Sequence, residues 1–232
     1  KRYGVNITAP APYVAEEVRK QLVEQYGEEF AYTAGLQVYT SINAKAQKAA
    51  QEAVLNNIHA YDERHGYRGA VRYLWDEESV DSTTDANASW DMARIEEHLR
   101  KFKNYGELVP AVITNVTEQS IYVQLKEEQI EVIDWDGLKW ARPYISDNKQ
   151  GPAPKLASDI VKRGAQIWLR PMAEKNYRLS QIPQVRGSFV AMDPRNGDIL
   201  ALVGGYSFQQ NQFNRITQAK RQVGSNIKPF LY

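Results

Sequence analysis

The stretch GSFVAMDPRNGDILALVGG, residues 187–205, decides the fold of the C-terminal part of the chain. Two segments rich in apolar residues, GSFVAMD and DILALVGG, lie on either side of the tetrapeptide PRNG. Turns favour Pro194, Asn196 and Gly197, because proline presets its φ angle and glycine tolerates a positive one. We therefore predict a hairpin of two antiparallel strands joined at residues 194–197.

A polar run follows this hairpin and ends in RQVGSNIKPFLY, residues 221–232. If the segment is the first turn of a helix, Ser225 and Lys228 lie on one face of it. Backbone N–H groups at a helix start can stabilise an oxyanion beside the serine. A lysine among apolar neighbours loses its charge more readily and can then accept the serine proton. The residue types and their spacing therefore allow a nucleophilic serine–lysine pair.

The S-x-x-K pattern has little specificity by itself. The chain has 11 serines and 14 lysines among 232 residues, so about 0.7 matches are expected by chance, and a match is only a hypothesis. A second match, Ser146 to Lys149, lies in a polar loop that is rich in proline and glycine. No apolar residues surround it to lower a lysine pKa, and we reject it as an active site.

The wider context gives the C-terminal pattern its meaning. From Gly187 to Tyr232 the chain follows VAxDPxxGxIxALVGG and then FNRxTQAxRQxGSxxKPFxY. This pattern resembles the opening of the transpeptidase domain of class A penicillin-binding proteins. One departure is Val223, where the family usually has proline, and this change leaves the Ser–Lys pair intact.

The remainder of the chain extends the resemblance. APYVAEEVRKQL (11–22) and GLQVYTSINAKAQKAAQEAV (35–54) resemble the linker between the glycosyltransferase and transpeptidase domains of these enzymes. YDERHGYRGA (61–70) and the segments after it resemble the OB-type insertion of the 1A type in Gram-negative bacteria. Glu16, Glu17 and Glu28 are not read as glycosyltransferase acids, because the acidic motifs of that domain are absent.

Hydrophobic periodicity predicts the secondary structure. Helical spacing indicates helices at 13–26 and 44–66, and a third that begins after Ser89 as its cap, with Met92, Ile95, Leu99 and Phe102 on one face. Residues 35–42 alternate and are rich in β-branched side chains, which predicts a strand. Further short strands are expected at 108–116, 120–125, 129–135, 160–171 and 176–182.

These elements predict an α+β fold. Five short strands with one helix favour a small OB-like antiparallel β-barrel, because OB folds have five strands. We expect three parts: a helical and stranded linker with the start of the transpeptidase region (1–66), an inserted OB-like barrel (67–183), and a truncated N-terminal part of the transpeptidase domain (184–232). The last part would contain the first hairpin and the nucleophile helix.

Composition excludes several function classes. The net charge of +1 gives no electrostatic argument for nucleic acid, and the absence of cysteine excludes disulfides and thiolate metal sites. The three histidines, His59, His65 and His98, lack metal-ligand spacing, so packing or solvent exposure is favoured and no cofactor or metal is expected. Trp135 and Trp140 flank DGLK and could stack on a ligand, although packing in the barrel is preferred.

The resemblance implies a serine acyl-enzyme mechanism. Ser225 would attack the penultimate D-Ala carbonyl of a peptidoglycan stem peptide, and Lys228 would act as the general base. The terminal D-Ala leaves, and an amine of a neighbouring stem peptide resolves the acyl-enzyme and forms the cross-link. β-Lactam antibiotics imitate D-Ala–D-Ala and trap the serine. The family also needs S-x-N and K-T-G motifs after the serine, and neither follows Ser225 in these 232 residues. We therefore expect these residues alone to be inactive.

The resemblance also implies partners and a location. The expected partners are peptidoglycan stem peptides, β-lactams and, through the insertion, an outer-membrane lipoprotein activator. The parent protein would be periplasmic and tethered to the inner membrane by a segment outside this chain, which reads as an excerpt of a longer protein. The alternative is a protein- or glycan-binding OB-like module, with residues 187–232 as a mere flank.

Overall fold

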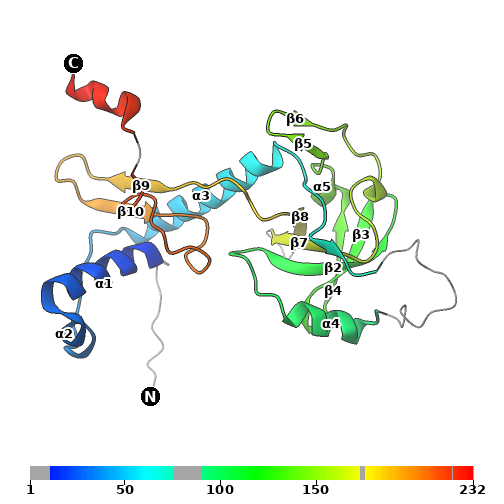
Figure 1. Ribbon diagram of the computed structural model, residues 1–232, viewed down its shortest axis with the longest axis horizontal. Helices are drawn as coiled ribbons and strands as arrows, with labels where there is room; N and C mark the ends of the chain where they lie inside the picture. Colours follow the sequence, from blue (N-terminus) through cyan, green and yellow to red (C-terminus); the bar gives the residue numbers. More distant parts are fainter. Residues whose placement is uncertain (1–10, 76–89, 173–175, 221, 232) are drawn as a thin grey trace. The chain divides into compact units, whose positions relative to one another are not determined.

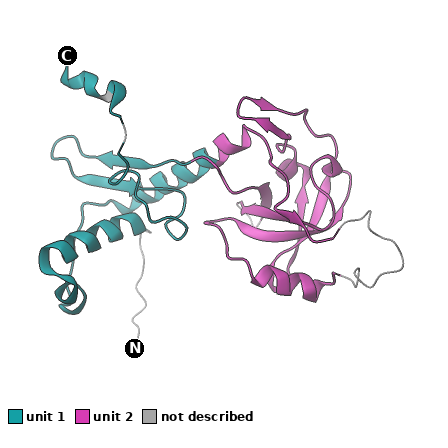
Figure 2. Cartoon of the chain, in the orientation of Figure 1, with its two compact units in different colours: residues 1–58, 186–232 teal, residues 59–185 magenta. Residues whose placement is uncertain are grey.

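A computed structural model describes residues 11–75, 90–172, 176–220 and 222–231. Ser89, the predicted cap of the third helix, lies outside the described residues. The chain divides into two compact units, which Figure 2 shows in different colours. Unit 1 combines residues 1–58 with residues 186–232, and unit 2 is formed by residues 59–185. The fold is α+β, as the sequence predicts.

The helices of the first 63 residues follow the apolar spacing of the sequence. Helix α1 (Pro12–Tyr26) begins with proline, which is suited to a first helical position, and ends at Gly27. A short helix that the sequence did not predict, α2 (Glu28–Thr33), follows at once. Helix α3 (Ala44–Glu63) is capped by Asn43, whose Oδ1 accepts a hydrogen bond from Ala46 N at 3.0 Å. Described helices do not include one that is long and apolar enough to cross a membrane.

The predicted hairpin is confirmed. Strands β9 (Phe189–Met192) and β10 (Ile199–Val203) pair antiparallel (Figure 1). In the turn, Gly197 has a φ of 79°, and its N–H donates to Asp193 O at 2.8 Å. Glycine is favoured at this position because a positive φ is costly for other residues.

The strand predicted at 35–42 is not formed. Only two hydrogen bonds connect this segment and the residue after it to β10: Ser41 Oγ donates to Ile199 O and Asn43 N donates to Leu200 O, both at 2.9 Å. The alternating apolar residues Leu36 and Val38 are exposed. Alternation indicates side chains suited to a pleated surface, but a strand also needs a continuous ladder with a neighbour.

Unit 2 is built on one six-stranded antiparallel sheet. Its order is β1-β7-β2-β3-β4. Strand β8 also pairs with β7, and it uses residues 168–171 of that strand. The strands are β1 (Arg72–Tyr73), β2 (Val109–Val116), β3 (Ser120–Gln124), β4 (Ile130–Asp134), β7 (Ala165–Pro171) and β8 (Tyr177–Ser180). The five predicted strands are therefore present, and β1 is an addition that is too short to leave a periodic signal.

One face of this sheet carries the core of unit 2. The inward positions of neighbouring strands supply fully buried side chains: Ile113, Ile121, Ile133, Ile167 and Leu169. Helix α5 (Trp135–Leu138) follows β4, and Leu138 joins the same cluster. The predicted loop 144–159 also contains a two-stranded ribbon, β5 (Tyr144–Ser146) and β6 (Lys149–Gln150).

Helix α4 (Met92–Arg100) covers part of the other face. Its cap is Asp91, whose Oδ1 accepts a hydrogen bond from Arg94 N at 2.8 Å. Ile95 and Leu99 are buried against Val112, as the spacing predicts, but Met92 is exposed and does not share their packing.

Candidate functional site

Ser225 and Lys228 lie on the last described helix. This 3₁₀ helix, η6 (Gly224–Phe230), begins at a glycine with a φ of 54° and contains Pro229. With three residues per turn, positions 225 and 228 lie one above the other. Both residues are exposed, and no hydrogen bond joins their side chains within the described part of the chain. The helix therefore brings the predicted pair onto one side without placing the two in contact.

The segment before this helix is held by a buried asparagine. Asn214 is 1% exposed, and its Oδ1 accepts a hydrogen bond from Ile216 N at 3.0 Å. Asn214 N donates to Gln218 Oε1 at 2.8 Å, and Gln218 N donates to Asn214 O at the same distance. These bonds satisfy the polar groups of a tight turn at residues 214–218.

Helix α1 holds this turn from a distant part of the sequence. Glu17 Oε1 accepts a hydrogen bond from Thr217 Oγ1 at 3.0 Å and one from Asn214 Nδ2 at 3.4 Å. Tyr13 Oη donates to Asn211 O at 3.0 Å. Glu17 is therefore a positioning residue for the C-terminal segment.

Two consecutive glycines make room for Tyr13. A Cβ on Gly204 would lie 2.6 Å from Tyr13 Cδ1, and one on Gly205 would lie 2.7 Å from Tyr13 Oη and 2.5 Å from Arg215 Nη1. Burial raises the pKa of Tyr13, and the nearby Arg215 opposes that rise. Sequence reasoning missed Tyr13, and the only signal for its contact was the pair of glycines after a strand.

The second S-x-x-K match has a different geometry. Ser146 ends β5 and Lys149 begins β6, and the two face each other across a tight turn. Both are exposed. This places the pair on a two-stranded ribbon and not on a helix start, which agrees with its rejection as an active site.

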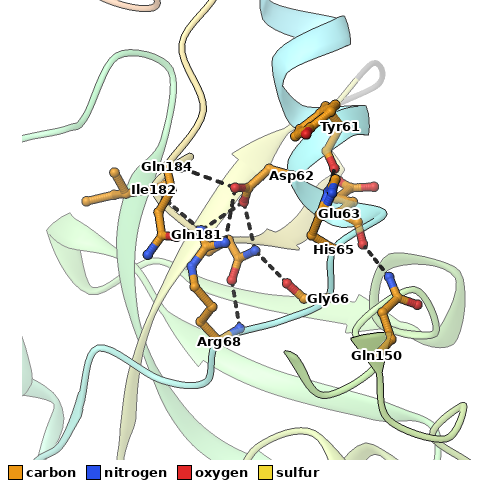
Figure 3. A network of polar contacts seen from close by, with 10 residues as sticks. All are labelled: Tyr61, Asp62, Glu63, His65, Gly66, Arg68, Gln150, Gln181, Ile182 and Gln184. Atoms are coloured by element: carbon orange, nitrogen blue, oxygen red, sulfur yellow. Dashed lines mark hydrogen bonds and ion pairs between the residues drawn. The ribbon is translucent and has the colours of Figure 1, made fainter. Parts of the chain in front are cut away.

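A buried polar network joins the two ends of the chain segment that forms unit 2 (Figure 3). Asp62, at the end of α3, is 3% exposed and accepts two hydrogen bonds from Arg68, at 3.0 and 2.9 Å. Its Oδ2 also accepts from Gln181 Nε2 at 2.8 Å, and its Oδ1 accepts from Gln184 N at 3.2 Å. One carboxylate thus holds both the entry and the exit of the unit.

Further contacts strengthen this junction. Arg68 Nη2 donates to Ile182 O at 2.8 Å. Glu63 pairs with Arg178 at 2.9 Å, and Gln150 donates to the carbonyls of Glu63 and Arg64. In the GYRG sequence at 66–69, both glycines have positive φ, and Tyr67 between them forms a β-bridge with Pro143.

A second buried cluster lies at the start of unit 2. His59 is 1% exposed, and its Nε2 lies 3.1 Å from Glu107 Oε1; Arg170 Nε lies 2.9 Å from the same oxygen. Burial by itself raises the pKa of Glu107, but the hydrogen bond from His59 and the charge of Arg170 outweigh it, so the net pKa lies below its ordinary value. The cluster is an ion pair that fixes α3 to β7.

The other histidines also contact ordinary protein groups. His65 Nδ1 lies 2.7 Å from Tyr61 O, and His98 Nε2 lies 2.9 Å from Gln166 Oε1. Among the described residues, no group of three or more His, Asp or Glu side chains is arranged to hold a metal. Trp140 packs edge-on against Tyr67 with ring centroids 5.9 Å apart.

Comparison with known proteins gives this fold its family. A family model of the penicillin-binding protein OB-like domain matches residues 67–185, which is just over half of the chain. A model of the penicillin binding protein transpeptidase domain matches residues 187–232. The chain therefore belongs to the penicillin-binding proteins that carry an OB-like domain.

The relatives are more specific. Penicillin-binding protein 1A of Vibrio cholerae is 45% identical over 236 residues, which cover 100% of this chain and 28% of that protein. Penicillin-binding protein 1A of Escherichia coli is 43% identical over 99% of the chain and 26% of its own length. The crystal structure of penicillin-binding protein 1A from Haemophilus influenzae matches 97% of this chain and 30% of its own, with a TM-score of 0.73 and 37% identity. The chain spans about a quarter of the length of the curated relatives it matches.

Proposed function

We propose that this chain is the inserted OB-like domain and the nucleophile-bearing start of a transpeptidase that cross-links peptidoglycan stem peptides. The observation that carries the proposal is the match to the transpeptidase domain over 187–232, which includes both Ser225 and Lys228. The same match disfavours the alternative of a binding module in which this segment is a flank. We assign residues 1–66 to the linker and the start of the transpeptidase region, 67–183 to the insertion, and 184–232 to the transpeptidase domain.

The proposed reaction is acyl transfer through a serine ester. Lys228 Nζ, as a neutral amine, takes the proton of Ser225 Oγ while Oγ bonds to the penultimate D-Ala carbonyl carbon. The C–N bond to the terminal D-Ala then breaks, and the proton passes to the leaving nitrogen. An amine of a second stem peptide attacks the ester carbonyl, and Ser225 Oγ recovers its proton as the cross-link forms. If water attacks the ester in place of the amine, the acyl group is hydrolysed, which is the carboxypeptidase reaction.

The structure supplies physical support for the role of Ser225. Asn214 and Glu17 hold the turn at residues 214–218, which precedes η6 in the sequence. An ordered segment before the serine limits the positions that it can take, which lowers the entropic cost of attack. We expect the residues that complete the pocket around Lys228 to come from parts of the transpeptidase domain outside these 232 residues.

The proposed partners and location are those that the resemblance implies, and the match to the transpeptidase domain supports the substrate. The substrates are peptidoglycan stem peptides, and β-lactams acylate the same serine. The protein acts in the periplasm, held at the inner membrane by a segment outside this chain, and the insertion binds an outer-membrane lipoprotein activator. A pull-down with residues 59–185 as bait tests whether the insertion binds the lipoprotein activator. Capture of the activator by the full chain but not by residues 59–185 would contradict this.

A chimera tests the catalytic proposal. This chain replaces the matching segment of the Vibrio cholerae relative, and the product is incubated with a fluorescent penicillin. We expect the chimera to be labelled and its Ser225→Ala variant to remain unlabelled, with equal thermal unfolding of the two. An equally labelled Ser225→Ala variant would exclude Ser225 as the nucleophile.

A further inference from the structure

Two hollows adjoin at the turn between β2 and β3 in unit 2. Their volumes are about 480 Å³ and about 570 Å³, and Thr117 and Glu118 line both. They lie far along the chain from Ser225 and have no part in the mechanism proposed for it. Ligand sites are usually concave and combine apolar or aromatic side chains with a few placed polar groups.

The shared rim is rigid. Thr117 N donates to Ser120 O at 2.9 Å, Ser120 N donates to Thr117 Oγ1 at 3.0 Å, and the two hydroxyl oxygens are 2.7 Å apart. Ala157 N donates to Glu118 O at 2.8 Å, which ties the turn to the loop before β7. A rim that is already ordered loses little entropy when a ligand binds.

The two tryptophans that flank DGLK differ at this surface. Trp140 Nε1 donates to Leu179 O at 3.0 Å, so its polar group is used within the fold. Trp135 packs one part of its ring against the core and lines the larger hollow. In the described ranges its indole N–H has no hydrogen-bond partner, although a buried tryptophan usually finds one. Trp135 therefore lines the hollow with an aromatic ring, and its N–H is not used by a described residue.

The two hollows carry different charges, although Glu118 lines both of them. Lys162 and Arg163 line the smaller one, both are exposed, and neither forms an ion pair with a described residue. The larger hollow is lined by Glu118 and Asp134, without lysine or arginine. A ligand that crosses both hollows would meet cations on one side and acceptor groups beside an indole on the other.

This pattern matches an oligosaccharide that carries carboxylates. A sugar ring can stack on the indole of Trp135 while its hydroxyls donate to Asp134. Its carboxylates can pair with Lys162 and Arg163. OB folds bind oligosaccharides through a strand face and the loops beside it, and residues 117–119 form the loop between β2 and β3 here. A nucleic acid fits less well, because its phosphates would approach Glu118 and Asp134.

We propose that the hollows around the β2–β3 turn form an accessory site for a carboxylate-bearing glycan strand. The identification of the strand as peptidoglycan rests on the proposed function, whereas the site itself rests on the geometry above. Binding here would hold the glycan chain next to an enzyme that acts on its peptides. It would raise the local concentration of substrate without any contact with Ser225.

Isothermal titration of the full 232-residue chain tests the site. The probe is peptidoglycan glycan strands freed of their stem peptides, which keep the lactyl carboxylates, and the matched uncharged probe is chitohexaose. We expect the Lys162→Glu/Arg163→Glu double variant to bind the glycan strands about tenfold more weakly and chitohexaose within about twofold of the unmodified chain. Lys149→Glu, an exposed lysine of β6, is the control and should change neither affinity.

A second variant tests the tryptophan. Trp135→Phe keeps the packing ring and removes the N–H, and we expect both probes to bind about threefold more weakly. The proposal is overturned by absent glycan binding, by an unaffected double variant, by an equal effect of Lys149→Glu, or by tighter binding of a single-stranded oligonucleotide. Glycan binding does not require acylation. A labelled chimera without glycan binding would therefore reject the accessory site alone, and the reverse result would reject Ser225 alone.

Discussion

Arg68 holds the buried carboxylate of Asp62 with two parallel hydrogen bonds of 3.0 and 2.9 Å. The pair joins the end of α3 to the turn that opens unit 2, and Gln184 from the exit of the unit donates to the same carboxylate. An insertion must leave its host and return to it at nearby points. The Asp62–Arg68 pair is the interaction that fixes those points here.

Removal of Arg68 should be severely destabilising. Arg68→Ala leaves Asp62 buried without its counter-ion, and we expect the free energy of unfolding to fall by about 3–5 kcal/mol. The control is Arg19→Ala, which breaks an exposed pair with Glu16 and should cost much less than the loss of Arg68. Urea unfolding followed by circular dichroism measures both, and similar losses in the two variants would contradict the assigned role.

The contact between Tyr13 and Gly204 predicts a coupled pair of mutations. Gly204→Ala places a methyl group 2.6 Å from Tyr13 Cδ1 and 2.7 Å from Asn214 Oδ1, and we expect a loss of about 1–3 kcal/mol from overpacking. In a Tyr13→Ala background the same substitution should cost less, because the ring is gone. A double-mutant cycle measures the difference. Additive effects would mean that another group sets the size of residue 204.

Glu107 predicts a pH dependence of stability. Its pKa is lowered in the folded chain below the ordinary value of 4.5. The resulting stabilisation is present above that value and is lost as the pH falls through the folded pKa. At pH 7 we expect Glu107→Gln to be less stable than the unmodified chain by about 1–3 kcal/mol. The gap should narrow below pH 4.5, and a gap that stays constant through the acid range would refute the ion pair.

The 232-residue chain alone should not react with a fluorescent penicillin. Ser225 and Lys228 are exposed on η6, and within the described residues no hydrogen bond connects their side chains. Acylation needs a base placed to take the proton of the serine hydroxyl, and this arrangement does not supply one. Gel fluorescence after incubation checks this, with the chimera as the positive control. A labelled serine in the isolated chain would show that these residues suffice for acylation.

Local patterns in the sequence predicted most of the fold, because periodicity and turn chemistry act over a few residues. PRNG predicted the β9–β10 turn, and the alternation after residue 108 predicted β2, β3 and β4. The segment 35–42 failed as a strand because a strand also depends on a distant partner. Helix α2 was missed because six residues carry too short a period.

The candidate site was predictable only in part. Ser225 and Lys228 were found from the S-x-x-K motif. The longer pattern over residues 187–232 indicated that this motif belongs to a transpeptidase domain. Tyr13, Glu17 and Asp62 were not found, because their roles depend on contacts with residues more than 100 positions away. Such long-range contacts produce no pattern in the local sequence. The sequence also could not distinguish Trp135 from Trp140. The structure does, because the indole N–H of Trp140 donates to Leu179 O.

Peptide mapping of the penicillin-treated chimera tests the central claim most directly. After digestion, mass spectrometry should find the penicilloyl adduct on the peptide that contains Ser225, and fragmentation should place it on that residue. The Ser225→Ala chimera should carry no adduct. An adduct on any other residue of the chimera, or one that persists in the alanine variant, would contradict the assignment of Ser225 as the nucleophile.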